Sequence, residues 1–175
     1  MSVFSMEQLG LTETQYQAAG GLTQIGRVAA QYRDGYTVLT ATGERAAVVA
    51  GRLRHAATRP ADFPAVGDFV ALEYDAEGAA LLWRVLPRHS VLVRQAAGTA
   101  GQEQLIAANV DTVFICMALN SDYNLRRLER YLSLVWSSGA TPVAVLTKAD
   151  VCEDMEEKMA EASFCACGAK VLCVS

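Results

Sequence analysis

The chain has 175 residues, of which 52% are hydrophobic and 19% are charged, and its formal net charge is −4. This composition is that of a folded globular protein, and it argues against a disordered chain and against a strongly basic nucleic-acid binder. The longest apolar run, residues 113–119, is too short to span a bilayer, and residues 1–10 lack the basic residue and long apolar core of a secretory signal. We therefore expect a cytoplasmic protein of one large domain or two small ones.

The first two segments of the chain predict a short arm followed by a small β-barrel. Residues 1–21 carry a helical pattern that starts near residue 5 and ends at Gly20 and Gly21, and we interpret them as an N-terminal arm. Residues 22–95 hold five short apolar runs separated by turn signals, an all-β pattern that indicates a barrel of the OB type, with an SH3-like barrel as the alternative. The predicted strands are residues 25–31, 36–41, 44–49, 66–72 and 80–86, with a long loop over 52–63.

The basic residues of the barrel segment suggest a partner rich in phosphate. All of them are arginines, whose guanidinium groups suit bidentate contacts with phosphate. An ordinary solvated surface would have the same composition, so charge alone leaves both interpretations open. The candidate RNA-binding residues are Arg27, Arg33, Arg52, Arg54 and Arg88. Candidates for stacking on bases are Tyr32, Tyr36 and Phe69, each of which fits the core equally well.

Residues 96–175 predict a partial α/β domain. Its apolar runs alternate between strand-like and helix-like spacing, after a Gly- and Ala-rich linker at 95–101. Short links between alternating strands and helices imply right-handed crossovers and a parallel sheet. The predicted elements are a strand over 113–119, a helix over 124–138, a strand over 142–146, a helix over 153–167 and a strand over 171–174.

Residue types predict further details of these elements. The first strand is continuously apolar, as expected of a strand that is buried on both faces of a sheet. The first helix has Ser121 or Asp122 as its candidate cap. Its apolar stripe comprises Leu125, Leu128, Tyr131, Leu132, Val135 and Trp136, and the corresponding face of the second helix comprises Met155, Met159, Ala162 and Ala166.

The cysteines show no metal-binding or redox pattern. No C-x-x-C pair exists, and Cys165 and Cys167 are too close in sequence for most structural zinc sites. We therefore expect reduced, mostly buried thiols and no metal site, with a redox or metal role as a distant alternative. The full set is Cys116, Cys152, Cys165, Cys167 and Cys173.

The most specific chemical signal is Thr147-Lys148-Ala149-Asp150, which directly follows the second predicted parallel strand. Ligands of such sheets bind beyond the carboxyl ends of the strands. Guanine presents two neighbouring donors, N1–H and the 2-amino group, and the carboxylate of Asp150 can accept both. Adenine has an acceptor at N1 and no 2-amino group, so it would leave the carboxylate unpaired. Lys148 can lay its methylene stem along the base or ribose. A solvated turn is the ordinary alternative.

Residues 84–150 resemble the bacterial small-ribosomal-subunit-dependent GTPases, the ribosome biogenesis GTPase A family of the circularly permuted class. Val66-Gly67-Asp68 in the barrel also fits this family. The usual first residue of the guanine motif is Asn, so Thr147 predicts weaker anchoring of the loop with retained choice of base. The matching stretches are Arg88-His89-Ser90-Val91-Leu92-Val93-Arg94, Ala108-Asn109-Val110-Asp111, Asn124-Leu125-Arg126-Arg127-Leu128-Glu129-Arg130-Tyr131-Leu132 and Val145-Leu146-Thr147-Lys148-Ala149-Asp150.

The resemblance implies an order of parts: an OB domain, then the guanine-recognition half of a GTPase domain, then the phosphate loop. The chain contains no G-x-x-x-x-G-K-[ST] phosphate loop, and the family's switch regions, catalytic histidine and C-terminal zinc site have no counterparts in it. We therefore interpret it as an N-terminal fragment, inactive alone, with no catalytic residue. The guanine-binding residues that the resemblance implies are Thr147, Lys148, Ala149, Asp150 and Ser175.

The resemblance also implies partners. The whole enzyme would bind GTP or GDP with Mg²⁺ and carry zinc in its C-terminal domain. It would act on the small ribosomal subunit in its late maturation, with the barrel bound to 16S-type rRNA. No membrane would be involved. A sheet of three strands leaves an unpaired edge, which favours a dimer of the fragment. The alternative function is a non-enzymatic RNA-binding OB module with an α/β docking platform.

Overall fold

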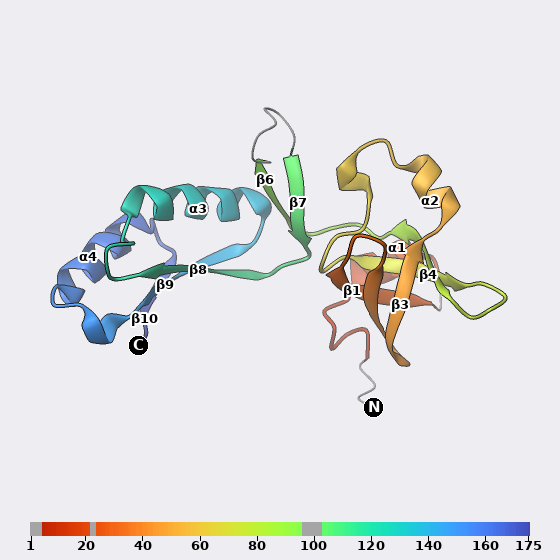
Figure 1. Ribbon diagram of the computed structural model, residues 1–175, viewed down its shortest axis with the longest axis horizontal. Helices are drawn as coiled ribbons and strands as arrows, with labels where there is room; N and C mark the ends of the chain where they lie inside the picture. The colour runs from red at the N-terminus through yellow and green to blue at the C-terminus, as the bar shows by residue number, and fades with distance from the viewer. Residues whose placement is uncertain (1–4, 22–23, 96–102) are drawn as a thin grey trace. The chain divides into compact units, whose positions relative to one another are not determined.

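The structure, a computed structural model, describes residues 5–21, 24–95 and 103–175, and it divides into two units, Met1–Asn109 and Val110–Ser175 (Figure 1). Apart from Gln95, the predicted linker at 95–101 lies outside the described residues. Within the described ranges, no helix is long and apolar enough to cross a membrane.

Five strands of the first unit close into a barrel in the order β1-β2-β3-β5-β4. Only the pair of β3 and β5 is parallel. Residues that alternate along the strands point inward and form a core around Val38, Val70 and Leu82, none of which is exposed. Closure leaves no edge unpaired, and it confirms the predicted OB-type barrel. The strands are β1 (Ile25–Gln31), β2 (Tyr36–Thr40), β3 (Gly43–Val49), β4 (Phe69–Tyr74) and β5 (Ala80–Val85).

Three parts of the first unit differ from the sequence prediction. Helix α2 (Gly51–Ala56) and the 3-10 turn η1 (Pro60–Asp62) occupy most of the predicted loop. Pro60 begins η1, because a proline is tolerated in a first turn, where its missing N–H would be unpaired anyway. β4 begins at Phe69 rather than at residue 66, since Gly67 turns the chain with a φ of +90°. An antiparallel hairpin, β6 (Val91–Gln95) and β7 (Glu103–Ala108), was not predicted at all.

The segment predicted as an arm packs against the barrel. Its helix α1 (Glu13–Ala19) begins later than predicted, because Thr12 caps it: the Thr12 side chain accepts from the Gln15 N–H, and the Gln15 side chain accepts from the Thr12 N–H. Ala19 joins Phe69 in a second apolar cluster, which Ile25 and Leu86 complete. The helix therefore shares a core with β1 and β4.

The second unit is a parallel sheet of three strands in the order β10-β9-β8, with helices α3 and α4 in the crossovers. This arrangement confirms the predicted partial α/β fold. Asn124 caps α3 by accepting the Arg127 N–H, so the prediction of Ser121 or Asp122 as the cap was wrong. The elements are β8 (Thr112–Ala118), α3 (Leu125–Ser138), β9 (Thr141–Thr147), α4 (Met155–Cys165) and β10 (Lys170–Cys173).

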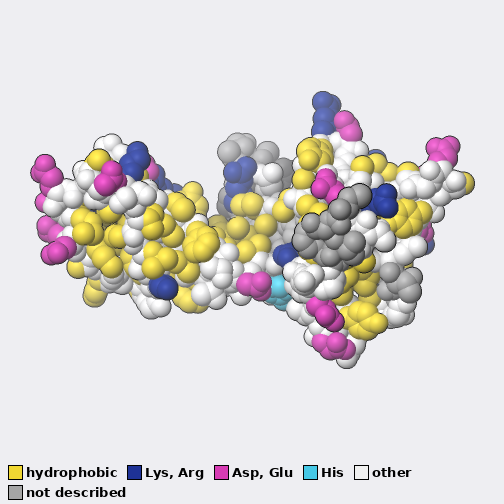
Figure 2. Space-filling view, turned by 90° about the horizontal axis from the view of Figure 1, so that it is seen from below, with side chains coloured by type: hydrophobic (Ala, Val, Ile, Leu, Met, Phe, Trp, Pro, Cys, Tyr) yellow, Lys and Arg dark blue, Asp and Glu magenta, His cyan; other side chains and the backbone are white. Residues whose placement is uncertain are grey.

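Among the described residues, helices cover only one face of this sheet. Ile115 and Met117 of β8 are buried, whereas Phe114, on the other face, is 64% exposed, so the prediction of a strand buried on both faces was wrong. Hydrophobic side chains gather on the side of this unit that Figure 2 shows. The apolar stripe of α3 is also narrower than predicted, because Tyr131 and Trp136 are exposed at its borders. None of the cysteines is buried, which contradicts the expectation of mostly buried thiols.

Candidate functional site

The three parallel strands of the second unit end at one edge of the sheet. β9 leads into Lys148 and the 3-10 turn η2 (Ala149–Val151), β8 leads into the loop 119–124, and β10 leads into Val174 and Ser175. Parallel α/β sheets bind ligands beyond the carboxyl ends of their strands. The predicted guanine motif and Ser175 are thus at the edge where a ligand is expected.

Backbone hydrogen bonds join these post-strand segments. The Leu119 N–H donates to the carbonyl of Thr147 at 2.9 Å, and the Ala149 N–H donates to the carbonyl of Val174 at 3.2 Å. The Val174 N–H in turn donates to the carbonyl of Leu146 at 2.9 Å. The motif is therefore anchored on both sides by main-chain groups, and Thr147 contributes its carbonyl rather than its side chain.

Lys148 turns the chain sharply at the end of β9. Its φ of 61° and ψ of 40° are in the left-handed region, which residues with a Cβ rarely adopt. The side chain is exposed, and the Val151 N–H donates to the Lys148 carbonyl at 3.4 Å to close the following turn. A strained backbone at an exposed polar residue is a feature that clusters at functional sites.

Asp150 lies two residues after Lys148, and its carboxylate is in solvent. The side chain is exposed, and it forms no hydrogen bond or ion pair with the residues that the structure describes. A carboxylate that is buried in the protein or held in a salt bridge has less capacity left to accept hydrogen bonds from a base. Asp150 retains its full capacity as an acceptor, as the predicted contact with the paired donors of guanine requires.

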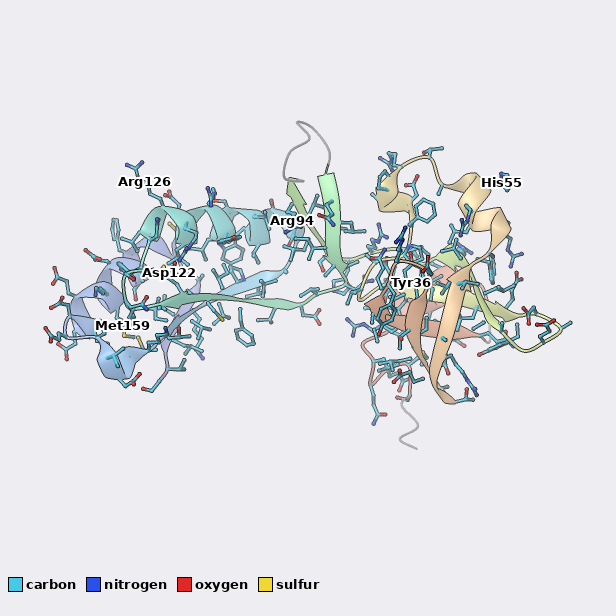
Figure 3. All side chains as sticks on the ribbon, in the orientation of Figure 1. Tyr36, His55, Arg94, Asp122, Arg126 and Met159 are labelled. Atoms are coloured by element: carbon cyan, nitrogen blue, oxygen red, sulfur yellow. The ribbon has the colours of Figure 1, made fainter. Side chains whose placement is uncertain are left out.

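A second carboxylate, Asp122, is located at the same edge, on the loop between β8 and α3 (Figure 3). Arg127 donates to its two oxygens at 2.9 and 2.7 Å. These hydrogen bonds lower the pKa of the Asp122 carboxyl, and the positive charges of Arg127 and Lys148 act in the same direction. In the sequence, Asp122 was only a candidate helix cap. The structure instead gives it a paired arginine and places it within electrostatic range of Lys148.

Two of the candidate RNA-binding arginines use their N–H donors in hydrogen bonds within the protein. Arg27 donates to the carbonyls of Leu9 at 2.6 Å, of Asn109 at 2.9 Å and of Gly67 at 3.3 Å. Arg88 binds the buried carboxylate of Asp68 through two N–H groups, at 2.8 and 2.7 Å. Both arginines therefore hold parts of the first unit together.

The other three candidates are exposed. Arg52 forms an ion pair with Glu73 and lies over the ring of Trp83, 4.1 Å from its centroid. Arg33 and Arg54 have no hydrogen bond or ion pair among the described residues, and both line one hollow of the barrel.

The three aromatic candidates also differ in exposure. Phe69 is fully buried in the core and Tyr36 is nearly so, whereas Tyr32 stands in solvent on the turn between β1 and β2. Of the three, only Tyr32 exposes a ring on which a base can stack.

A polar network in the first unit explains why several motif residues occur together. The side chain of Asn109 accepts from the His89 N–H at 3.0 Å and from the Gln15 amide at 3.0 Å, and it donates to the Gly67 carbonyl at 3.1 Å. These residues come from α1, the turn before β4 and the two ends of the β6–β7 hairpin. In the part of the chain that the structure describes, no group of three or more His, Cys, Asp or Glu side chains is placed to hold a metal ion.

Comparison with known proteins points to one family. The model of the RsgA GTPase family matches residues 85–175. The small ribosomal subunit biogenesis GTPase RsgA 2 of Lactiplantibacillus plantarum is 52% identical over 135 residues, which are 77% of this chain and 38% of that protein. The small ribosomal subunit biogenesis GTPase RsgA of Syntrophotalea carbinolica is 44% identical over 147 residues, which are 80% of this chain and 40% of that protein.

Solved structures show a similar fold. YjeQ from Thermotoga maritima matches 87% of this chain and 51% of its own, with a TM-score of 0.65 and 22% identity. YloQ, described as a circularly permuted GTPase, matches to the same extent with a TM-score of 0.64. The chain spans about two fifths of the length of the curated relatives it matches.

Proposed function

Because this chain belongs to the RsgA GTPase family, we propose that it supplies the OB barrel and the guanine-recognising half of a GTPase that acts in late maturation of the small ribosomal subunit. The relatives carry small-subunit biogenesis in their names. The observation that carries the proposal is the carboxylate of Asp150 at the carboxyl edge of the parallel sheet, which is exposed and has no partner in the part of the chain that the structure describes. A cytoplasmic location follows from this role.

We assign a separate role to each segment. Residues 22–95 form the rRNA-binding barrel, with residues 1–21 as its N-terminal arm, and residues 96–175 form the base-reading half of the GTPase domain. In this half, Asp150 accepts the N1–H and 2-amino group of guanine, Lys148 covers the base or ribose with its methylene stem, and Ser175 begins the second base-contacting loop.

Hydrolysis requires groups that this chain does not provide. A phosphate loop supplies the backbone donors and the lysine that hold the β- and γ-phosphates, together with the hydroxyl that holds Mg²⁺, and the 175 residues contain no such motif. We therefore propose that the chain alone does not hydrolyse GTP, and that Mg²⁺ and zinc bind to other parts of the whole protein. The uncovered face of the sheet favours association of the isolated chain with a second copy.

Exchange of the base-reading carboxylate tests the proposal. In the complete protein, Asp150→Asn replaces an acceptor by an amide donor, so it should weaken GTP binding and favour xanthosine triphosphate, whose 2-oxo group needs a donor. Hydrogen bonds to a charged group contribute about 1.5–3 kcal/mol each, so the loss of GTP affinity should reach at least about tenfold. Competition binding with the two nucleotides measures the preference.

A matched variant controls for changes in surface charge. Glu153→Gln removes a neighbouring exposed carboxylate from the segment after η2 and should leave the preference for guanine unchanged. If the Asp150→Asn and Glu153→Gln variants show the same preference between GTP and xanthosine triphosphate, Asp150 does not recognise the base. The proposed site is then wrong.

A further inference from the structure

The barrel carries a hollow of about 720 Å³ between the β1–β2 turn and the segment that holds α2 and η1. This volume is within the range of small-ligand sites. Apolar and aromatic side chains line part of it, and charged side chains line the rest. The apolar and aromatic members include Tyr32, Tyr36, Val48, Val49 and Phe63, and the charged members are Arg33, Asp34, Arg54 and Arg59.

The charge of this hollow is opposite to that of the whole chain. Three arginines and one aspartate line it, which leaves an excess of two positive charges in a protein whose net charge is −4. Arg33 and Arg54 are exposed and form no hydrogen bond or ion pair among the described residues. Arg59 contacts Asp62 at 3.1 Å, yet its side chain remains 75% exposed. Arg33 and Arg54, which have no acidic partner among the described residues, favour an anionic ligand.

The hollow also offers an exposed aromatic ring on a turn whose backbone is held in place. The Tyr32 N–H donates to the Gly35 carbonyl at 2.8 Å, which closes the turn and holds the backbone of this residue. The Tyr32 side chain is 64% exposed, so its ring is not required by the core. Tyr36, labelled in Figure 3, lies nearby with its ring buried, and the positive charge of Arg54 acts on its hydroxyl. An exposed ring beside Arg33 and Arg54, which have no partner among the described residues, provides both a stacking surface and phosphate donors.

We propose that this hollow binds an unpaired nucleotide of single-stranded RNA, with the base stacked on Tyr32 and the flanking phosphates held by Arg33 and Arg54. This inference rests on the proposed RNA-binding role of the barrel and locates that role on one surface. A duplex keeps its bases stacked on one another and offers phosphates, 2′-hydroxyls and base edges but no free base face, so it would leave Tyr32 unused. An acidic peptide would satisfy the arginines and likewise leave the ring unused.

Binding of short labelled RNA to the 175-residue chain tests the proposal. Fluorescence anisotropy compares a single strand of about 12 nucleotides with a duplex that contains the same strand. Tyr32→Ala should weaken binding of the single strand by at least about fivefold and leave the duplex unaffected, because stacking contributes only where a base is free. Tyr32→Phe keeps the ring and should retain wild-type affinity. Arg54→Gln should reduce the slope of log affinity against log salt by about 0.7, the value for one phosphate contact to a single strand.

Control variants change the same residue types outside the hollow. Tyr16→Ala removes an exposed ring from α1, and Arg45→Gln removes an exposed charge from β3. Both should bind the single strand like the wild type. Circular dichroism confirms the fold of each variant.

The possible outcomes separate this inference from the proposed function. If the wild type binds the single strand and Tyr32→Ala binds it equally well, the hollow is not the site, while the RNA-binding role of the barrel stands. If polyglutamate displaces the RNA, and Arg54→Gln weakens the binding of polyglutamate as much as the binding of RNA, the hollow binds acidic polypeptide. The inference is then overturned. If the wild type binds no RNA of either form, both the hollow and the proposed role of the barrel are wrong.

Discussion

The sequence made Arg88 a candidate RNA-binding residue, whereas its contacts in the structure predict that it stabilises the first unit. Its guanidinium donates two hydrogen bonds to the carboxylate of Asp68 and two more to the carbonyls of Ala61, at 2.7 Å, and Phe63, at 3.0 Å. The Asp68 side chain is fully buried, and the Arg88 side chain is only 15% exposed. We predict that Arg88→Ala destabilises the first unit severely.

The magnitude follows from the charge that the substitution leaves behind. Removal of one partner of a buried ion pair costs about 3–5 kcal/mol, because the other charge stays buried without compensation. After Arg88→Ala, the Asp68 carboxylate keeps one donor, the Ala65 N–H at 2.8 Å. Since domains are stable by about 5–15 kcal/mol, such a loss would leave the unit close to its unfolding threshold.

Urea unfolding followed by circular dichroism measures the effect, with Arg84→Ala as the control. Arg84 is an exposed arginine of β5, and its replacement should change the free energy of unfolding by no more than about 0.5 kcal/mol. The double variant Asp68→Asn with Arg88→Gln removes both charges and should recover part of the lost stability. An Arg88→Ala protein with wild-type stability and reduced RNA binding would refute the reasoning and restore Arg88 as an RNA contact.

Two further predictions concern the backbone and a carboxylate of the first unit. Gly67→Ala should lower the free energy of unfolding by more than about 2 kcal/mol, because a Cβ would meet the Ala108 carbonyl oxygen at 2.0 Å and because a residue with a Cβ is strained at a positive φ. Gly78 has a φ of +84° and open space around it, so Gly78→Ala measures the cost of the positive φ alone. Equal losses of stability for the two variants in thermal denaturation would contradict the effect of the close approach. The N–H groups of Thr58 and Arg59 lower the pKa of Asp62 to about 2, so the stabilisation that its charge gives to this turn is present above the ordinary value of 3.8 and is lost as the pH falls through about 2. An NMR titration of the Asp62 carboxyl that has its midpoint near the ordinary value would contradict this assignment.

Much of the fold could be predicted from the sequence because periodicity and turn residues report local structure. The barrel strands and the alternating strands and helices of the second unit were found within a few residues of their observed bounds. The β6–β7 hairpin was missed, since its two strands flank a Gly- and Ala-rich stretch that has the composition of a linker. Helix α2 was missed because it has only six residues, too few to establish a period.

Burial was harder to predict than element type. The continuous apolar run of β8 indicated a strand covered on both faces, yet Phe114 and Cys116 are exposed in the described chain. A sequence pattern shows which residues favour burial, and it does not show which other segments cover them. Tyr131 and Trp136 of α3 illustrate the same limit, because helical spacing of apolar residues does not show how many of them at the edge of the stripe are buried.

The candidate site shows why motif residues divide into two kinds. Asp68 and Asp150 are both aspartates of motifs that carry the resemblance, but Asp68 is buried and fully engaged by Arg88, whereas Asp150 is exposed and has no partner among the described residues. The same contrast separates Arg88 from Arg54, which lines the hollow without a partner in the described part of the chain. A polar group whose hydrogen bonds are satisfied within the protein stabilises the fold, while one that is held in place with its capacity unused can bind a ligand. Residue type and spacing are alike in both kinds, so the hydrogen-bond partners in the structure are what separate Asp150 and Arg54, which we propose as binding residues, from Asp68 and Arg88, which stabilise the fold.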